Sequence, residues 1–319
     1  MSMLCYVFPG QGSQYAGMGR EVAARSDAAR RAFEAADLAL GEPISRLCFE
    51  GPEEALRLTA NTQPAILAVS IAVLEAAREA GAPEPDVVAG HSLGEYTALV
   101  AAGALALEDA MRHVRARGTF MQEAVPVGAG AMAAVLGLDA AEVAAACEEA
   151  AEGDVVGPAN YNSPGQVVIA GAAAAVSRAG DAARRRGAKR VVPLEVSAPF
   201  HSALMEPAAE RLRPLLEATE FRDPRVPVVA NVTAEPVRTG AEARRLLVRQ
   251  VASAVRWEQS VERLAADGVA RWVEIGPGRV LSGLIRKIVR GADCVSVERP
   301  EEIEMAFATP DAGAAPAVS

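Results

Sequence analysis

Residues 90–94 read Gly-His-Ser-Leu-Gly, the Gly-x-Ser-x-Gly form in which a sharp turn presents a serine hydroxyl as a nucleophile. The short predicted strand 86–89, Asp-Val-Val-Ala, before this turn and the helical sequence 95–102 after it indicate a strand-turn-helix unit. At the start of such a helix, the main-chain N–H of Leu93 can stabilise a developing oxyanion. A glycine-rich turn with an incidental serine has the same pattern, but this placement favours Ser92 as a nucleophile.

A serine hydroxyl needs a base to take its proton, and the chain has only three histidines. His91 adjoins the serine within the turn, so its side chain should leave in another direction. His113 falls inside a predicted helix, where an exposed or structurally satisfied histidine is the ordinary case. His201 follows Ser-Ala-Pro-Phe in a predicted loop, from which a side chain can face a cleft. We therefore predict His201 as the base, the alternative being a histidine without a role near a helix N-terminus.

Arg117 lies in a predicted helix over residues 107–124 and has two interpretations. It is one of several arginines that such a helix can expose to solvent, or its guanidinium grips a carboxylate with two hydrogen bonds. The sequence leaves both open. Gln11, Gln63 and Gln250 are likewise ordinary polar residues when they are considered singly.

Composition excludes several classes of function. The four cysteines are far apart and form no Cys-x-x-Cys pair, so the sequence predicts neither a metal site nor a disulfide framework. Reduced cysteines, together with an N-terminal sequence that lacks a basic segment and a cleavage site, predict a cytoplasmic protein. Charged residues interrupt every long apolar stretch, which argues against a membrane span. The net charge of −9 disfavours nucleic-acid binding, because such binding needs a basic surface.

Two groups of basic residues stand out against this acidic background. The first basic cluster comprises Arg184, Arg185, Arg186, Lys189 and Arg190, and the second basic cluster comprises Arg279, Arg286, Lys287 and Arg290. A solvated charged face is the ordinary explanation for such clusters. Docking of an acidic partner is the alternative.

The elements around these residues alternate between strands and helices, which predicts an α/β protein. The chain opens with a strand at residues 4–8 and a glycine-rich loop at 9–14, followed by helical sequence that includes 27–40. Apolar residues at helical spacing predict a further helix after Thr62 that ends at Gly81.

Between about residues 130 and 194 the pattern changes to that of a ferredoxin-like unit, strand-helix-strand-strand-helix-strand. Its elements are predicted at 131–136, 140–151, 155–161, 166–170, 173–186 and 190–194. The chain then resumes with a helix at 203–218, strands at 227–230 and 271–275, and a helix at 280–289. We therefore predict a large domain made of residues 1–127 and 197–308, interrupted by a small domain at 128–196. The tail 309–319, mostly Ala, Pro and Gly, is predicted to be flexible.

Taken in order, the motifs resemble the malonyl-CoA:acyl carrier protein transacylase family from about residue 4 to about residue 307. They are Phe-Pro-Gly-Gln-Gly-Ser-Gln at 8–14, Thr-Gln-Pro-Ala at 62–65, Gly-His-Ser-Leu-Gly-Glu at 90–95, Arg117-Gly118, Met121-Gln122, Asn-Tyr-Asn-Ser-Pro-Gly-Gln at 160–166, Phe-His-Ser at 200–202, Asn-Val-Thr at 231–233, Gln250, Val-Arg-Trp at 255–257 and Glu-Ile-Gly-Pro-Gly at 274–278. Each motif alone is weak, but the ordered series is specific.

The resemblance implies an α/β-hydrolase-like large domain with a parallel sheet, an inserted ferredoxin-like small domain, and an active site between them. It implies that Ser92 accepts the acyl group and that His201 acts as base and then as acid. A main-chain carbonyl, that of Gln250 here, would orient the histidine. The oxyanion hole would consist of the main-chain N–H groups of Gln11 and Leu93.

The resemblance also implies how the substrate is held. Arg117 would bind the malonyl carboxylate, and Phe200, Gln63, Met121 and Asn162 would line the substrate site. A phenyl ring before the histidine and a leucine after the serine accompany malonyl preference in related domains, since little space is left for a 2-methyl branch.

The activity so implied is ping-pong transfer of malonyl from malonyl-CoA to the phosphopantetheine thiol of an acyl carrier protein, by a monomer without a cofactor. The acidic carrier would dock on the basic clusters. Two other interpretations stay open: a serine hydrolase or thioesterase that uses the same turn, and a non-catalytic module that only docks carrier proteins. A hydrolase usually has an acidic triad member between nucleophile and histidine, and no Asp or Glu is singled out here.

Overall fold

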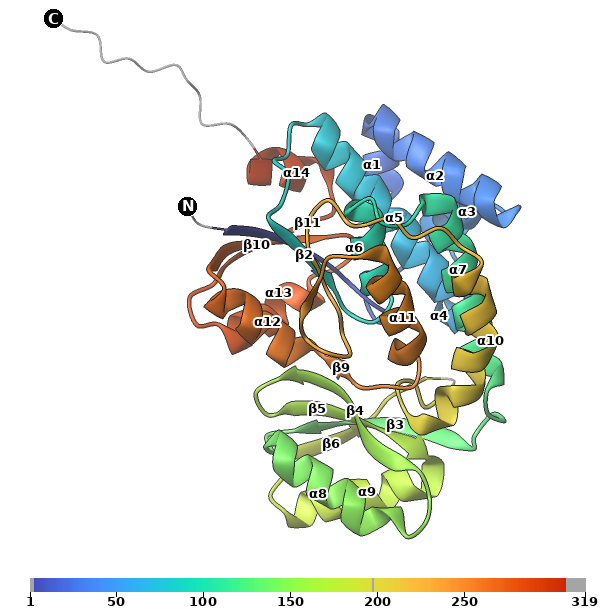
Figure 1. The fold of residues 1–319 in the computed structure, drawn as a ribbon, viewed down its shortest axis with the longest axis vertical. Helices are drawn as coiled ribbons and strands as arrows, with labels where there is room; N and C mark the ends of the chain where they lie inside the picture. The colour runs from blue at the N-terminus through green and yellow to red at the C-terminus, as the bar shows by residue number, and fades with distance from the viewer. Residues whose placement is uncertain (1–2, 197, 308–319) are drawn as a thin grey trace, which may run out of the picture.

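A computed structural model describes residues 3–196 and 198–307 of the chain, and it contains two sheets (Figure 1). The predicted flexible tail, 309–319, lies outside the described residues. The strands of the large sheet are, in spatial order, β11 (Asp293–Val297), β10 (Val269–Ile275), β1 (Met3–Phe8), β2 (Val87–Gly90), β7 (Val228–Val229) and β8 (Pro236–Val237). All neighbours are parallel except β7 and β8.

The large sheet is apolar on both faces, as a parallel sheet covered by helices must be. Successive residues of β1 alternate between two cores: Tyr6 and Phe8 join one, and Cys5 and Val7 join the other. The helices that contribute to the first core are α1 (Arg20–Arg25), α2 (Asp27–Leu40), α3 (Ile44–Glu50), α4 (Glu53–Arg57), α5 (Thr59–Glu79), α6 (Gly94–Ala101), α7 (Leu107–Glu123), α10 (Glu206–Glu217), α11 (Gly240–Gln250) and α14 (Pro300–Phe307). The second core is closed by α12 (Trp257–Ala266) and α13 (Val280–Ile288).

The small sheet has the spatial order β6 (Arg190–Pro193), β3 (Gly130–Leu136), β5 (Gln166–Ala172), β4 (Val156–Ser163) and β9 (Val255–Arg256). Its first four strands are antiparallel neighbours. Figure 1 shows α8 (Ala140–Ala151) and α9 (Ala173–Arg185) on the side of this sheet that faces away from the large sheet. The predicted strand-helix-strand-strand-helix-strand order is therefore present.

The fifth strand of the small sheet, β9, comes from a distant part of the chain. Asn160 and Tyr161 of β4 pair in parallel with Val255 and Arg256 of β9, directly before α12, which packs against the large sheet. The two sheets also share apolar packing, because Met132 and Val168 of the small sheet belong to the first core, which covers one face of the large sheet. The two sheets are thus joined by shared packing as well as by the chain.

Most predicted elements are found within a few residues of their expected bounds, but some differ. The helix expected after Thr62 begins at Thr59, and the helix expected at 203–218 is divided into a 3₁₀ turn, Ala203–Met205, and α10. The pattern analysis did not place the short helices α1, α3 and α4, nor β8, α11, β9, α12, β11 and α14. Most of these are short or edge elements whose stability comes from tertiary contacts, whereas α11 and α12 are amphipathic helices of ordinary length that the pattern analysis missed.

One helix of the described chain, α5, is long and apolar enough to cross a membrane by length and composition. However, 83% of its most apolar window is buried inside the structure. Its neighbours are α2, α3 and α7, and it is the central helix of the first core.

Candidate active site

Ser92 lies at the turn between β2 and α6 with a positive φ of 53°. Two glycines make this turn sterically feasible. A Cβ on Gly90 would lie 1.9 Å from the main-chain oxygen of Gly94, and a Cβ on Gly94 would lie 2.1 Å from that of Phe8. The turn therefore lifts the serine hydroxyl above the end of β2, while the following helix starts against β1.

His201 meets this hydroxyl from the loop that follows the small sheet. Its Nε2 lies 2.7 Å from Oγ of Ser92, and its Nδ1 lies 2.9 Å from the main-chain oxygen of Gln250 and 3.2 Å from that of Ser253. Because a carbonyl only accepts hydrogen bonds, Nδ1 must carry the proton and Nε2 is left as the acceptor for Ser92. His201 has this orientation without a carboxylate on Nδ1.

The electrostatic surroundings keep His201 neutral. Burial, and secondly the positive charge of Arg117, lower the pKa of His201 to about 3, against the weaker opposing effect of the carbonyl of Gln250. A neutral imidazole can take the serine proton at any pH well above that value.

Arg117 is 2% exposed and points from α7 to the same hydroxyl. Its Nη2 donates to Oγ of Ser92 at 3.0 Å and to Oε1 of Gln250 at 2.9 Å, and its Nη1 donates to Oε1 of Gln63 at 2.6 Å. Its Nε has no partner. No carboxylate of the described residues forms an ion pair with this guanidinium. The arginine therefore offers a buried positive charge beside the nucleophile.

The close packing of α5 and α7 fixes the position of this arginine. Gly118 lies so near α5 that a Cβ would be 2.6 Å from the main-chain oxygen of Thr59. Pro64 cannot donate to the carbonyl of Ala60 four residues earlier, and Nη1 of Arg115 donates to that carbonyl instead, at 2.8 Å. Both contacts hold the two helices in the register that brings Arg117 next to Gln63.

Beneath the hydroxyl lies a network of amides around a buried carboxylate. Oδ1 of Asn231 accepts from the main-chain N–H of Ser92 at 2.6 Å, and Nδ2 of Asn231 donates to the carbonyl of Gly90 at 2.7 Å. Nε2 of Gln250 donates to the carbonyl of Ser92 at 2.9 Å and to Oε2 of Glu95 at 2.8 Å. Oε2 of Glu95 also accepts from the main-chain N–H of Asn231 at 3.0 Å. Burial raises the pKa of Glu95 to about 7.

Gln11 and Leu93, whose main-chain N–H groups are the predicted oxyanion donors, line the same cavity. Neither donates to any acceptor within residues 3–196 and 198–307. Leu93 directly precedes α6, so its N–H is one of the free donors of a helix N-terminus. The loop of Gln11 is held by its side-chain Nε2, which donates to Thr59 at 3.3 Å. Two such donors can bind an oxyanion.

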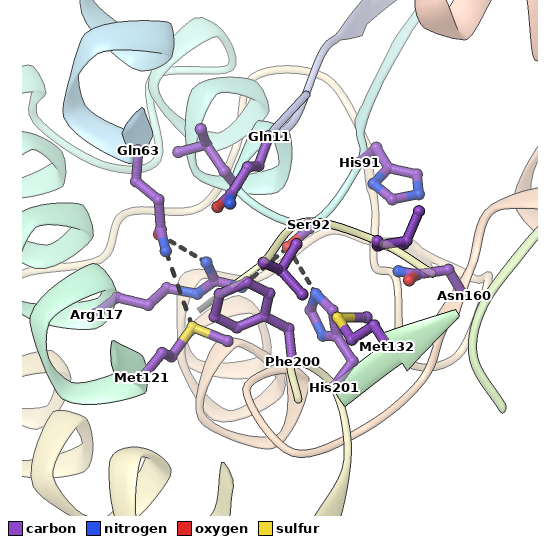
Figure 2. A pocket seen from close by; sticks show the side chains of 13 residues that line it. Gln11, Gln63, His91, Ser92, Arg117, Met121, Met132, Asn160, Phe200 and His201 are labelled. Carbon is purple, nitrogen blue, oxygen red and sulfur yellow. Dashed lines mark hydrogen bonds between the residues drawn. The ribbon is translucent and has the colours of Figure 1, made fainter. Parts of the chain in front are cut away.

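The cavity has a volume of about 120 Å³ and lies between the two sheets. Figure 2 shows Gln63, Arg117 and Met121 on one side of Ser92, and Met132 and Asn160 of the small sheet on the other. Phe200 also lines it and is 8% exposed.

The predicted substrate residue Asn162 lies elsewhere. It is not among the residues that line the cavity, and its Oδ1 lies 2.9 Å from Nε2 of His91 instead. Its neighbour two positions earlier, Asn160, takes the place in the cavity wall. In a regular strand, side chains two positions apart point to the same face, so Asn160 and Asn162 would face the same way. The pairing register of β4 is irregular at Pro158/Asn160 and at Tyr161/Ser163, so the sequence alone does not tell which asparagine faces the cavity.

Two polar residues of the site, Glu95 and Asn231, were not singled out from the sequence, although both lie within motifs that carry the resemblance. Residue spacing gives no signal for them, because their partners lie on other elements. His91, excluded as the base, points away from the hydroxyl to Asn162, and burial lowers its pKa. Within the described part of the chain, no group of three or more His, Cys, Asp or Glu side chains has the arrangement of a metal site.

Comparison with known proteins places this geometry among acyl transferases. Residues 5–302 match the family described as acyl transferase domain. The chain is 51% identical over 310 residues to the malonyl CoA-acyl carrier protein transacylase of Bacillus subtilis, which covers 97% of this chain and 98% of that protein. It is similar to the crystal structure of an acyl carrier protein S-malonyltransferase from Vibrio cholerae, with a TM-score of 0.94, 44% identity, and coverage of 96% and 100%. It is also similar to a malonyl-transacylase whose structure was solved in complex with its type II polyketide synthase acyl carrier protein. The TM-score is 0.94 and the identity 47%, and the match covers 96% of this chain and 99% of that one.

Proposed function

The chain belongs to the malonyl-CoA:acyl carrier protein transacylase family, and from this premise we propose that it transfers malonyl from malonyl-CoA to the phosphopantetheine thiol of an acyl carrier protein. The relative from Bacillus subtilis is named malonyl CoA-acyl carrier protein transacylase, and the polyketide structure contains such an enzyme together with its carrier protein. The similarity to the family extends over almost the whole chain, so the proposal concerns both halves of the transfer reaction.

The first half-reaction acylates the serine. Oγ of Ser92 attacks the thioester carbonyl while Nε2 of His201 takes its proton, and the C–S bond breaks when the tetrahedral intermediate collapses. The N–H groups of Gln11 and Leu93 stabilise the oxyanion, each donor contributing on the order of 3 kcal/mol. His201 returns the proton to the departing thiolate, so coenzyme A leaves as a thiol.

The second half-reaction runs the same steps with a new nucleophile. The carrier's thiol loses its proton to His201 and attacks the malonyl ester, and Ser92 leaves with the proton that the imidazole returns. Because Nδ1 of His201 is held by carbonyl oxygens, the ring keeps one tautomer through both halves.

The observation that carries the proposal is the position of Arg117, whose Nη2 lies 3.0 Å from Oγ of Ser92. A buried guanidinium with no carboxylate of its own suits an acyl group that ends in a carboxylate. It suits the neutral acyl chain of a typical esterase poorly. Phe200, beside the base, supports the preference for malonyl over a branched malonyl group.

Incubation with malonyl-CoA, followed by mass spectrometry, tests the proposed function. We expect a malonyl adduct on Ser92 that is absent in Ser92→Ala and that disappears when a carrier protein with its phosphopantetheine arm is added. Rapid loss of malonyl-CoA without any carrier would identify a hydrolase. No adduct at all would support a module that only docks carriers.

We propose that the carrier docks chiefly on the second basic cluster. All three consecutive arginines of the first cluster have acidic partners of their own: Arg184 with Asp181, Arg185 with Glu149, and Arg186 with Glu142. Lys189 and Arg190 of the first cluster form no ion pair within the described residues. In the second cluster Arg279 pairs with Glu302, whereas Arg286, Lys287 and Arg290 form no ion pair there, so a larger share of its charge is free. Charge reversal of Arg290 should raise the KM for the carrier and leave malonylation of Ser92 unchanged, while Arg185→Glu serves as the matched control.

Several further expectations belong to the same proposal. We propose that the large domain comprises residues 1–127 and 197–308 and the small domain residues 128–196; four of the five strands of the small sheet come from this last range, and β9 is the exception. A cytoplasmic location is supported by four free cysteines, all of them buried. Cofactor-free chemistry is consistent with a covalent serine intermediate, and a monomer is the proposed oligomeric state.

A further inference from the structure

Glu95 is a buried carboxylate that the reaction above does not use. It is 2% exposed, in the first turn of α6, three residues after the nucleophile. Its Oε2 accepts two hydrogen bonds, one from the main chain of Asn231 and one from Nε2 of Gln250. Neither bond reaches Ser92 Oγ or His201, so Glu95 acts through its two partners: Asn231 leads to the main chain of Ser92, and Gln250 leads to Arg117.

Gln250 connects this carboxylate to the arginine. Its Nε2 donates to Glu95 at 2.8 Å, and its Oε1 accepts from Nη2 of Arg117 at 2.9 Å. The charges of Glu95 and Arg117 are therefore separated by one amide rather than joined in a salt bridge. A direct salt bridge would compensate the buried charge of Arg117, but it would also occupy the N–H donors of the guanidinium that a substrate carboxylate needs. The intervening amide compensates part of the buried charge and leaves the guanidinium available.

The same arrangement fixes the direction in which the amide points. Two acceptors, the carboxylate of Glu95 and the carbonyl of Ser92, lie on the Nε2 side of Gln250. If the amide were reversed, its NH₂ group would face the NH₂ donors of Arg117 and its oxygen would face two acceptors. Without the acceptor at position 95, the Nε2 side keeps only the Ser92 carbonyl and the more distant Oδ1 of Asn231, at 3.5 Å, so reversal of the amide becomes less costly.

We propose that Glu95 is a positioning residue for acyl selection: by holding the amide of Gln250 in one orientation, it holds Arg117 where a dicarboxylic acyl group is bound. The inference rests on the proposed malonyl transfer. A purely structural role, support of the turn that carries Ser92, is the competing explanation. It predicts equal losses for every acyl donor, whereas loss of arginine positioning affects only donors that end in a carboxylate.

Two substitutions at position 95 separate these explanations. Glu95→Leu removes the acceptor, whereas Glu95→Gln keeps an oxygen that can accept from Asn231 and Gln250. The readout is single-turnover acylation of Ser92 by malonyl-CoA and by acetyl-CoA, each over a range of concentrations. Glu274→Gln is the matched control, because Glu274 is equally buried but binds the main-chain N–H groups of Leu281 and Ser282 at the start of α13.

We expect Glu95→Leu to lower the malonyl-to-acetyl preference roughly tenfold or more, mainly by raising the half-saturating concentration of malonyl-CoA. Glu95→Gln and Glu274→Gln should keep the preference within about threefold of the parent protein. If Glu95→Leu does not fold, Gln250→Met removes the same bridge from its other end and should lower the preference likewise, since the main-chain carbonyl for His201 remains.

An unchanged malonyl-to-acetyl ratio in a folded Glu95→Leu or Gln250→Met protein overturns the inference, as does an equal loss with both donors. Failure of the proposed function is a different result: the parent protein itself would then form no malonyl-serine or pass none to a carrier.

Discussion

Oγ of Ser92 lies 2.7 Å from Nε2 of His201, although 109 positions of the chain separate the two residues. Both residues have positive φ, 53° and 59°, which costs a side-chain-bearing residue about 1–3 kcal/mol and persists only where neighbours fix the backbone. Asn231 and Gln250 bind the two main-chain groups of Ser92, and two carbonyls hold the ring of His201. The strained pair is thus held by contacts from residues 231–253.

The low pKa of His201, about 3, predicts a flat pH profile. At saturating malonyl-CoA, the rate constant for malonylation of Ser92 should stay level from pH 8 down to about pH 5, without the fall near pH 6.5 that an ordinary histidine would give. Protonation of Glu95, whose pKa is about 7, should change the half-saturating concentration of malonyl-CoA instead. Arg117→Ala removes one cause of the lowered pKa of His201. With acetyl-CoA as donor, the fall of the acylation rate constant at acidic pH should therefore occur at a higher pH in this variant. Rapid-quench acylation across this range measures both profiles, and a limb near pH 6.5 in the parent protein would contradict the assignment.

The sign of the stability change with pH follows from the same shift. Below about pH 6.5 the unfolded chain binds a proton at His201 that the folded chain does not, so this residue lowers the free energy of unfolding as the pH falls toward 3. Denaturant unfolding at each pH therefore defines the range in which the kinetic profile applies.

Arg117→Ala should lower kcat/KM for malonyl-CoA by about 100-fold, the equivalent of about 3 kcal/mol for a lost charged hydrogen-bonding pair. Acetyl-CoA has no terminal carboxylate, so its kcat/KM should change far less. Arg117→Lys should fall between, because an ammonium keeps the charge but loses the paired donors. Steady-state kinetics with both donors measures the effect, and equal losses with both would refute the carboxylate contact.

Gly94→Ala should destabilise the protein by about 3 kcal/mol or more, since its Cβ would lie 2.1 Å from the main-chain oxygen of Phe8 and force β1 and α6 apart. Gly283→Ala is the control within a helix. No atom lies within 4 Å of its added Cβ, and it should stabilise by about 0.5–1 kcal/mol. Denaturant unfolding of both variants tests the prediction, which fails if Gly94→Ala is as stable as the parent.

Phe200→Ala should widen the acyl site beside His201 and raise the methylmalonyl-to-malonyl ratio of kcat/KM by about tenfold, within the range that one methyl group accounts for in an apolar pocket. Phe120→Ala serves as its control, because that ring packs on the guanidinium of Arg211 at 4.1 Å and does not line the cavity. Competition between the two acyl-CoAs gives the ratio directly. A ratio that stays constant in Phe200→Ala would remove the phenyl ring from the account of specificity.

The parts of the site that the sequence predicts are those tied to local structure. The turn at Ser92 follows from two glycines between a strand and a helix, and elimination among three histidines left His201. The antiparallel unit β3 to β6 follows from short apolar runs that alternate with helical sequence within one continuous segment.

What the sequence does not predict depends on contacts between distant segments. Glu95 and Asn231 meet only because β2 and β7 are neighbours, and the two-residue strand β9 has no pattern of its own. The contacts of the Gln250 side chain cannot be predicted either, since its four partners come from α6, α7, the turn at Ser92 and the segment after β7. The choice between Asn160 and Asn162 needs the irregular register of β4.

The strand β9 makes the length of one short connection critical. Four residues, 251–254, separate Gln250, whose carbonyl accepts the hydrogen bond from Nδ1 of His201, from Val255, which pairs with Asn160 of β4. An inserted or deleted residue in this connection would have to displace either the pairing partner or the carbonyl. Among related chains, insertions and deletions should therefore occur in loops far from this connection. The segment 251–254 should keep four residues even where its side chains vary.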